Sequence, residues 1–327
     1  MPNIITHKLF AQKVFQNCDK QDIKNMIEKH LQLFYIGSNG PDFLFFYHMQ
    51  PKEMMKEHSL NHIGSALHAG NVNAFYESAV NTIKQEQDPF TKESELVYLF
   101  GHLCHWALDM SVHPYIFYRT GHNTRLSSSY HHRFESMLDA IMLKHFYHMD
   151  VSEYHCSAIC EFDREMLKAI ARIYVPAVKA ALNEQIHVNQ LRNALISWRK
   201  VQELLYDPKQ NKKSVLQKVE HIIKQPWLVS GNVIPTQIDE TYDVMNWNKQ
   251  TWCHPCDQTQ VSNASFLEMF ENAISLAISV WKKAYGCIEY DADIHALLNE
   301  IDDRAYDTGR KGNVEMKYFA CIYDETV

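Results

Sequence analysis

The sequence is poor in the residues that interrupt helices, with only ten glycines and ten prolines in 327 residues. It also has almost no strict alternation of apolar and polar residues, the pattern of a half-buried strand. Apolar residues instead recur at intervals of three and four, as on one face of a helix. We therefore expect an all-α protein. The expected helices are residues 6–17, 20–34, 71–86, 92–113, 128–147, 161–186, 189–205, 213–224, 264–285 and 291–302.

Long apolar runs are missing as well. The run FLFFY at residues 43–47 is far shorter than the roughly 20 residues that span a membrane. The opening segment, MPNIITHKLFAQKVF, contains no apolar run of signal-peptide length. We therefore expect a cytoplasmic protein with no transmembrane segment, which leaves peripheral contact with a membrane open.

The charge pattern argues against one class of partner. The formal net charge is -7, and no run of like charges is long enough for a basic arm or an acidic tail. Binding to a phosphate backbone requires clustered basic residues. We therefore expect no nucleic-acid partner.

The eight cysteines do not follow the spacing of a disulfide framework. Cys253 and Cys256 form a CxxC motif, but no second CxxC follows at zinc-ribbon spacing and no βαβ pattern surrounds it. We therefore interpret this motif as a Pro-containing turn before a helix rather than a redox or zinc site.

The histidines are distributed unevenly, since fourteen of the nineteen precede residue 150. This asymmetry predicts a metal-binding domain over residues 1–155. Residues 156–327 are expected to form a helical extension that packs on the first part as one unit. Most Gly and Pro residues, together with several Asn and Ser residues, fall in segments 35–70, 114–127 and 225–262, which are expected to be connections.

The spacing of histidines and acids between Gly101 and Glu135 is the main indication of function. His105, Asp109 and His113 recur every four residues, and the same interval separates His131 from Glu135. On a helix this spacing puts side chains on one face, about one turn apart. Imidazole and carboxylate donors together suit Zn²⁺. The alternative is that such pairs are surface ion pairs or hydrogen-bonded core residues.

Asp109 favours the metal interpretation. It lies in the apolar string LFGHLCHWALDM, where an unpaired carboxylate would be costly to bury. A bound cation would remove that cost.

The strings ITHKLFA, GPDFLFFY, IGSALH, FGHLCHWALDMSVHPY and YHHRFESMLD resemble the zinc-dependent phospholipase C family, also described as the phospholipase C/D domain. The resemblance covers about residues 1–150 and is weaker around WCHPCDQTQVSNASF. It implies an all-helical fold with two or three zinc ions, two of them bridged by Asp109. The metal ligands that it implies are His7, Asp42, His68, His105, Asp109, His113, His131 and Glu135.

Some positions have competitors in this sequence. His58 and His62 compete with His68, which is preferred because GSALH resembles the family string and because it is expected to open a helix. His132 competes with His131, but only His131 lies four residues from Glu135. His102 could also face the cluster, although it is not part of the family pattern.

One departure from the family concerns the third zinc. In secreted members, removal of a signal peptide exposes an N-terminal Trp whose amino group and carbonyl bind that ion. This sequence shows neither feature. The third site is therefore expected to be built differently, weakly occupied or absent.

The activity implied by the resemblance is hydrolysis of a phosphodiester by a metal-activated water. Asp42, expected in a loop after Gly40 and Pro41, would ligate zinc, act as general base, or do both. The substrate is expected to be a phosphoester, with phospholipids among the candidates. The aromatic residues at 43–47 and 115–118 could line a groove for it, but are expected more often in the core.

Two other functional classes remain open. A non-catalytic helical protein could use zinc only to hold its helices together. A nucleotide phosphohydrolase of the HD type would contain a His-Asp dipeptide, and the sequence contains none.

Overall fold

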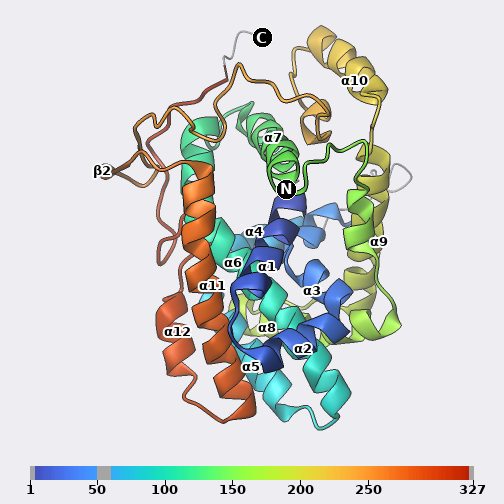
Figure 1. The fold of residues 1–327 in the computed structure, drawn as a ribbon, viewed down its shortest axis with the longest axis vertical. Coiled ribbons are helices and arrows are strands. Elements are labelled where there is room, and N and C mark those ends of the chain that lie inside the picture. The colour runs from blue at the N-terminus through green and yellow to red at the C-terminus, as the bar shows by residue number, and fades with distance from the viewer. Residues whose placement is uncertain (1–3, 50–59, 324–327) are drawn as a thin grey trace.

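The computed structural model describes residues 4–49 and 60–323. Within these ranges the chain forms twelve α-helices, three short 3-10 helices and one two-stranded sheet (Figure 1). The expectation of an all-α fold is confirmed. None of the described helices has the length and apolar composition needed to cross a bilayer.

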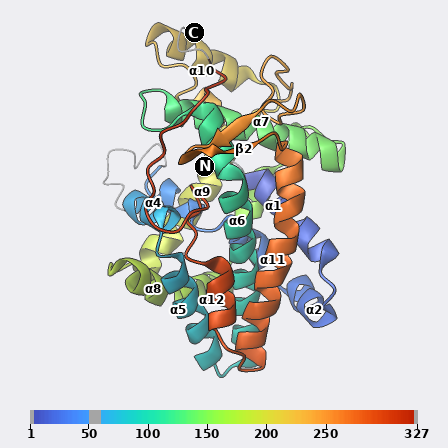
Figure 2. The same cartoon turned by 90° about the vertical axis from the view of Figure 1, so that its left-hand side faces the viewer.

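The longest helix, α6 (Pro89–Thr120), is the centre of the fold. It begins where the Asp88 side chain accepts a hydrogen bond from Thr91 N and Pro89 occupies the first turn. Most of its residues are buried, because other helices pack around it (Figure 2). These helices are α1 (Ile4–Asn17), α3 (Leu31–Gly37), α7 (Ser127–Tyr147), α8 (Arg164–Leu182) and α11 (Phe266–Glu289).

The remaining helices lie outside this group or extend it. They are α2 (Gln21–Lys29), α4 (Asn61–Ala69), α5 (Val72–Gln85), α9 (Val188–Leu205), α10 (Asn211–Ile222) and α12 (His295–Ile301). The 3-10 helices are η1 (Asp42–Phe46), η2 (Cys156–Cys160) and η3 (Ser230–Asn232).

Two glycines allow α3 and α6 to cross at close range. A Cβ on Gly37 would overlap the Tyr98 carbonyl, and a Cβ on Gly101 would overlap the Phe34 carbonyl. The close crossing therefore requires glycine at this position on each of the two helices. It brings the segment that follows α3, including Asp42, toward the middle of α6.

The sequence predictions were wrong for three helical segments. Residues 20–34 form two helices that meet at His30, and α4 lies inside the segment 35–70 that was expected to be a connection. Helix α6 does not end at residue 113; it continues through Pro114 to Thr120. A proline removes one backbone donor but does not end a helix whose next turns are held by packing.

The CxxC segment forms the turn of a hairpin. Cys253 lies in β1 (Trp252–His254), which pairs antiparallel with β2 (Asp257–Ser262) across Pro255 and Cys256. The predicted turn is present, but it leads into a strand rather than a helix. Both cysteines are free thiols, and neither belongs to a metal-compatible group of the described residues.

Helices from both sides of residue 155 share one core. Helix α8 packs on α5, and α11 packs on α1 and α6. Near the end of the chain, Tyr306 N donates to the carbonyl of His68 at 3.0 Å. The division of the chain at residue 155 stays a prediction.

Candidate metal centre

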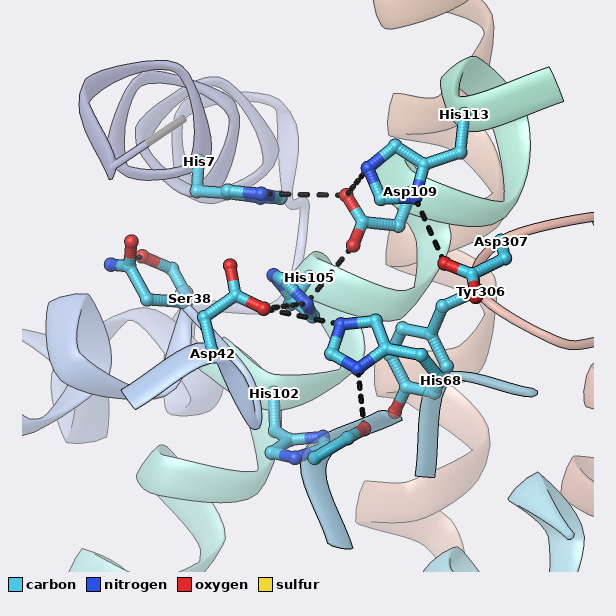
Figure 3. A network of polar contacts seen from close by, with 12 residues as sticks. His7, Ser38, Asp42, His68, His102, His105, Asp109, His113, Tyr306 and Asp307 are labelled. Carbon is cyan, nitrogen blue, oxygen red and sulfur yellow. Dashed lines mark hydrogen bonds and ion pairs between the residues drawn. The ribbon is translucent and has the colours of Figure 1, made fainter. Parts of the chain in front are cut away.

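Three side chains of α6 project from one face of the helix, as their spacing predicted. Asp109 Oδ2 lies 3.0 Å from His105 Nε2, and Asp109 Oδ1 lies 3.6 Å from His113 Nε2 (Figure 3). All three side chains are buried. Asp109 thus presents one oxygen to each histidine.

His7 reaches the same carboxylate from α1. Asp139 of α7 accepts hydrogen bonds from Ile5 N at 3.2 Å, Thr6 N at 2.8 Å and Thr6 Oγ1 at 2.7 Å. These backbone N–H groups belong to the first turn of α1 and have no partner within the helix. The contact fixes the start of α1 and places His7 Nε2 3.3 Å from Asp109 Oδ1.

Asp42 is the first residue of the 3-10 helix η1, so the expectation that it lies in a loop was wrong, although it does not lie on an α-helix. It follows a turn in which Gly40 has φ +49°, and a Cβ on Gly40 would overlap the ring of His105. Asp42 Oδ1 lies 3.1 Å from His68 Nε2 and 3.7 Å from His105 Nε2. Close approach at Gly40 thus brings Asp42 to the histidines.

His68 lies in the last turn of α4; the expectation that it opens a helix was wrong. Its Nδ1 lies 2.8 Å from the Gly64 carbonyl of the same helix, which can only accept a hydrogen bond. With Nδ1 protonated, neutral His68 has a lone pair at Nε2, which faces the oxygen of Asp42. Two acceptors at this distance require a proton or a cation between them.

His131 and Glu135 lie on the first turns of α7. His131 Nε2 is 3.1 Å from Glu135 Oε1, and His113 Nε2 is 3.6 Å from the same oxygen. His113 therefore connects this pair to Asp109 on α6.

The competing histidines lie elsewhere or have other partners. His62 is exposed and pairs with Glu184 at 2.6 Å, and His58 lies outside the described residues. His102 is buried between the hydroxyls of Tyr76 at 2.9 Å and Tyr174 at 3.1 Å. His132 lines the cavity described below but is in none of the metal-compatible groups.

The eight side chains make three groups whose donor atoms lie within 4.8 Å of one another. The groups are His7, Asp42 and His105; His68, His105 and Asp109; and His113, His131 and Glu135. His105 Nε2 and Asp109 Oδ1 are buried without a hydrogen-bond partner, which is costly unless a cation interacts with them. Mixed nitrogen and carboxylate donors are a typical zinc set. The residues therefore fit a multinuclear zinc centre.

The electrostatics of the centre agree with this fit. Burial alone would raise the pKa of Asp42 and Asp109, but the neighbouring imidazoles, His105 first, hold both pKa values below the usual value. Burial and the nearby His105 lower the pKa of His7 to about 4. Burial would also lower the pKa of His68, but the Asp42 carboxylate raises it to about 9. A cation between His68 and Asp42 would displace that proton.

A cavity of about 420 Å³ opens over the three groups. Phe45 and Phe117 line it, whereas Phe43, Phe46 and Tyr115 are buried in the core. The remaining wall is mostly polar. Its side chains outside the eight candidate ligands include Ser65, His122, Asn123, Thr124, Ser127, Ser128, His132 and Asp307.

Two residues near the end of the chain reach the centre and were missed in the sequence. Asp307 Oδ1 lies 3.7 Å from His113 Nδ1, the ring nitrogen that faces away from Asp109 and Glu135. The ring of Tyr306 lies 5.2 Å from that of His68 and 5.6 Å from that of His105. No local pattern marks either residue, because their role comes from contacts with distant parts of the chain.

Fold and site together define an all-helical protein whose buried histidines and carboxylates suit several zinc ions. The family model for zinc-dependent phospholipase C matches residues 6–184, more than half of the chain. The chain belongs to this family. No curated protein and no solved structure gives a significant match. All eight candidate ligands lie inside the matched range, whereas Tyr306 and Asp307 lie beyond it.

Proposed function

We propose that the protein is a phospholipase C-like enzyme that hydrolyses phosphoric diesters with two or three zinc ions. The main support is the arrangement of Asp109, whose oxygens face histidines from α1 and α6; two of these histidines, His7 and His113, line the cavity. The residues proposed to hold the ions are His7, Asp42, His68, His105, Asp109, His113, His131 and Glu135.

The protein's own side chains would divide the work at this centre. Bound zinc supplies a Lewis acid for the phosphoryl oxygen and lowers the pKa of a coordinated water. The carboxylate of Asp109 would offset the positive charge of the ions that the neighbouring histidines bind. Asp42 is partly exposed at the cavity wall and is oriented by His68, so it can ligate an ion, accept a proton from the attacking water, or do both.

The cavity wall is consistent with a phosphoester substrate. Hydroxyl and amide groups of Ser65, Asn123 and Thr124 can bind a polar head, and Phe45 and Phe117 can contact an adjacent apolar part. A phospholipid fits this description. Cytoplasmic location and the lack of a nucleic-acid partner stay predictions from the sequence.

The test is a comparison of substrates with zinc-loaded protein. Phosphomonoesters, soluble phosphodiesters, nucleotides and phospholipids are each incubated with it, and release of phosphate or phosphorylated product is measured. We expect turnover of diesters. Bound zinc without turnover of any ester would favour a structural role, and turnover confined to nucleotides would favour a nucleotide phosphohydrolase.

A further inference from the structure

Helix α10 exposes three of its four large apolar residues to solvent, and only Leu216 is half-buried. Val215, Val219 and Ile222 follow one another at intervals of four and three, so they form one stripe, and they are 62%, 51% and 78% exposed. Lys213 and Glu220 of the same helix are buried instead. A helix packed on a soluble domain normally shows the opposite arrangement. The stripe therefore requires an explanation beyond the fold.

The exposed charged side chains of α10 and of the chain segments directly before and after it are of one sign. Glu220, the only acid of α10, accepts hydrogen bonds from Val229 N at 2.7 Å and from Ser230 N at 2.8 Å. Asp207 is likewise buried and accepts from Lys213 N at 2.8 Å. Within residues 207–229 the exposed charged side chains are all lysines: Lys209, Lys212, Lys218 and Lys224. A protein of net charge -7 thus carries a local basic and apolar surface.

This surface is attached to the wall of the cavity. Arg125 Nη1 donates to the Lys224 carbonyl at 3.0 Å, and Arg125 directly follows Thr124, which lines the cavity. Ser136 Oγ of α7 donates to the Gly231 carbonyl of η3 at 2.6 Å. Figures 1 and 2 both place α10 at one extreme end of the molecule, beyond α7.

We infer that α10, together with the exposed Leu228 and Val229, docks on an anionic lipid surface. An interfacial helix of this kind buries its apolar side chains at the level of the headgroups while flanking lysines contact anionic lipids. A second copy of the chain is a poorer partner, because a two-fold contact would place the same lysines opposite one another. The inference rests on the proposed function and extends it. Docking of α10 would bring the cavity next to a lipid surface, and phospholipids are phosphodiesters.

Sedimentation with vesicles tests the inference with the full-length, zinc-loaded protein. Vesicles of phosphatidylcholine and phosphatidylserine are compared with vesicles of phosphatidylcholine alone. We expect clear binding only to the anionic vesicles, weakened by salt. Replacing Val219 and Ile222 by Asp should lower the partition coefficient at least about 10-fold, because two apolar contacts become anionic. Lys218→Gln should lower it by a smaller factor.

Matched control variants show whether a change in vesicle binding is specific to the α10 stripe or follows from any added Asp or removed Lys on the surface. Val261→Asp changes a valine that is 61% exposed on β2, and Lys20→Gln removes an exposed lysine near α2. Both should bind like the wild type. Equal binding to the two kinds of vesicle, or unchanged binding of the Val219 and Ile222 variant, would overturn the inference. So would a wild-type dimer in the absence of lipid that this variant converts to a monomer.

A soluble phosphodiester, assayed without vesicles, separates this inference from the proposed activity. The variant of Val219 and Ile222 should hydrolyse it at the wild-type rate. If the wild type hydrolyses no phosphoester but binds anionic vesicles through the stripe, the proposed activity fails and the docking surface stands.

Discussion

Asp109 is the residue on which most of the proposed metal centre is expected to depend. It is buried among apolar side chains of α6, and it faces His7, His105 and His113. Asp109→Asn keeps the shape but removes one anion, which leaves cationic charge without compensation. We expect zinc content and melting temperature to fall together, as measured by elemental analysis and thermal unfolding.

Glu95 provides the matched control for this change. It is a buried carboxylate of the same helix, but its partner is Arg172 rather than the metal centre. Glu95→Gln should lower the melting temperature and leave zinc content unchanged. Unaltered zinc content in Asp109→Asn would make Asp109 an ordinary buried polar residue.

Asp42 is expected to matter more for turnover than for folding. It lies at the start of η1 and reaches the cavity, whereas the other carboxylates of the centre lie on long helices. Asp42→Asn should retain most of the zinc while hydrolysis of a soluble phosphodiester falls by roughly 10² or more, the scale of losing a positioned base. Zinc analysis and initial rates of the same preparation check this. Equal rates in variant and wild type would remove Asp42 from the mechanism.

Asp307 is expected to orient His113. Its carboxylate faces His113 Nδ1, so that Nε2 points toward Glu135 and Asp109. Outer carboxylates of this kind typically change metal affinity 10- to 100-fold, so Asp307→Ala should weaken zinc binding by about 10-fold or more. Competition with a chelator measures this without reference to activity.

Two further variants distinguish orientation from folding. Asp307→Asn retains an acceptor oxygen and should recover part of the affinity. Asp302→Asn changes an exposed acid of the same segment, which pairs with Lys311, and should have no effect. Equal affinity in Asp307→Ala and the wild type would show that His113 needs no outer partner.

At the level of the elements, the crossing of α3 and α6 positions the centre. A Cβ on Gly101 would overlap the carbonyl of Phe34 and press on the backbone at Gly37. Gly101→Ala should therefore lower the free energy of unfolding by about 1–3 kcal/mol, the usual effect of overpacking. Denaturant unfolding measures the change.

Gly286→Ala is the control for the glycine substitution. Gly286 lies inside α11, and a Cβ there would meet only Ala292 at 3.6 Å. Alanine should be neutral or slightly stabilising at this position, because glycine is a poor helix former. If both variants were equally stable, close packing at the crossing would not be needed.

The elements of the site differ in how well the sequence predicted them. Helices α6 and α7 follow from long periodic patterns, and the interval of four places their histidines and acids correctly on one face. Helix α4 was missed, because it has only nine residues and lies in a segment rich in Gly and Pro. Its residue His68 was found through the family resemblance, although His68 ends a helix rather than opening one.

At the level of the whole molecule, the end of the chain completes the centre. Trp106 Nε1 donates to the Arg304 carbonyl at 2.9 Å, and Tyr306 N donates to His68 O at 3.0 Å. These contacts hold Asp307 against His113. Periodicity and local spacing indicate only which residues close together in the sequence share a helix face. They could not predict that Asp307 would contact His113. The exposed stripe of α10 also emerged only with the fold, because an amphipathic pattern does not say which face is covered.

The central claim is that several zinc ions at this centre hydrolyse phosphodiesters, and a zinc titration tests it most directly. Zinc is added stepwise to metal-free protein while bound zinc and the hydrolysis of a soluble phosphodiester are measured in the same samples. We predict no hydrolysis without zinc and a plateau only after at least two ions per chain are bound, because the candidate ligands form more than one group. Full zinc occupancy without hydrolysis, or a plateau at one ion per chain, would contradict the account.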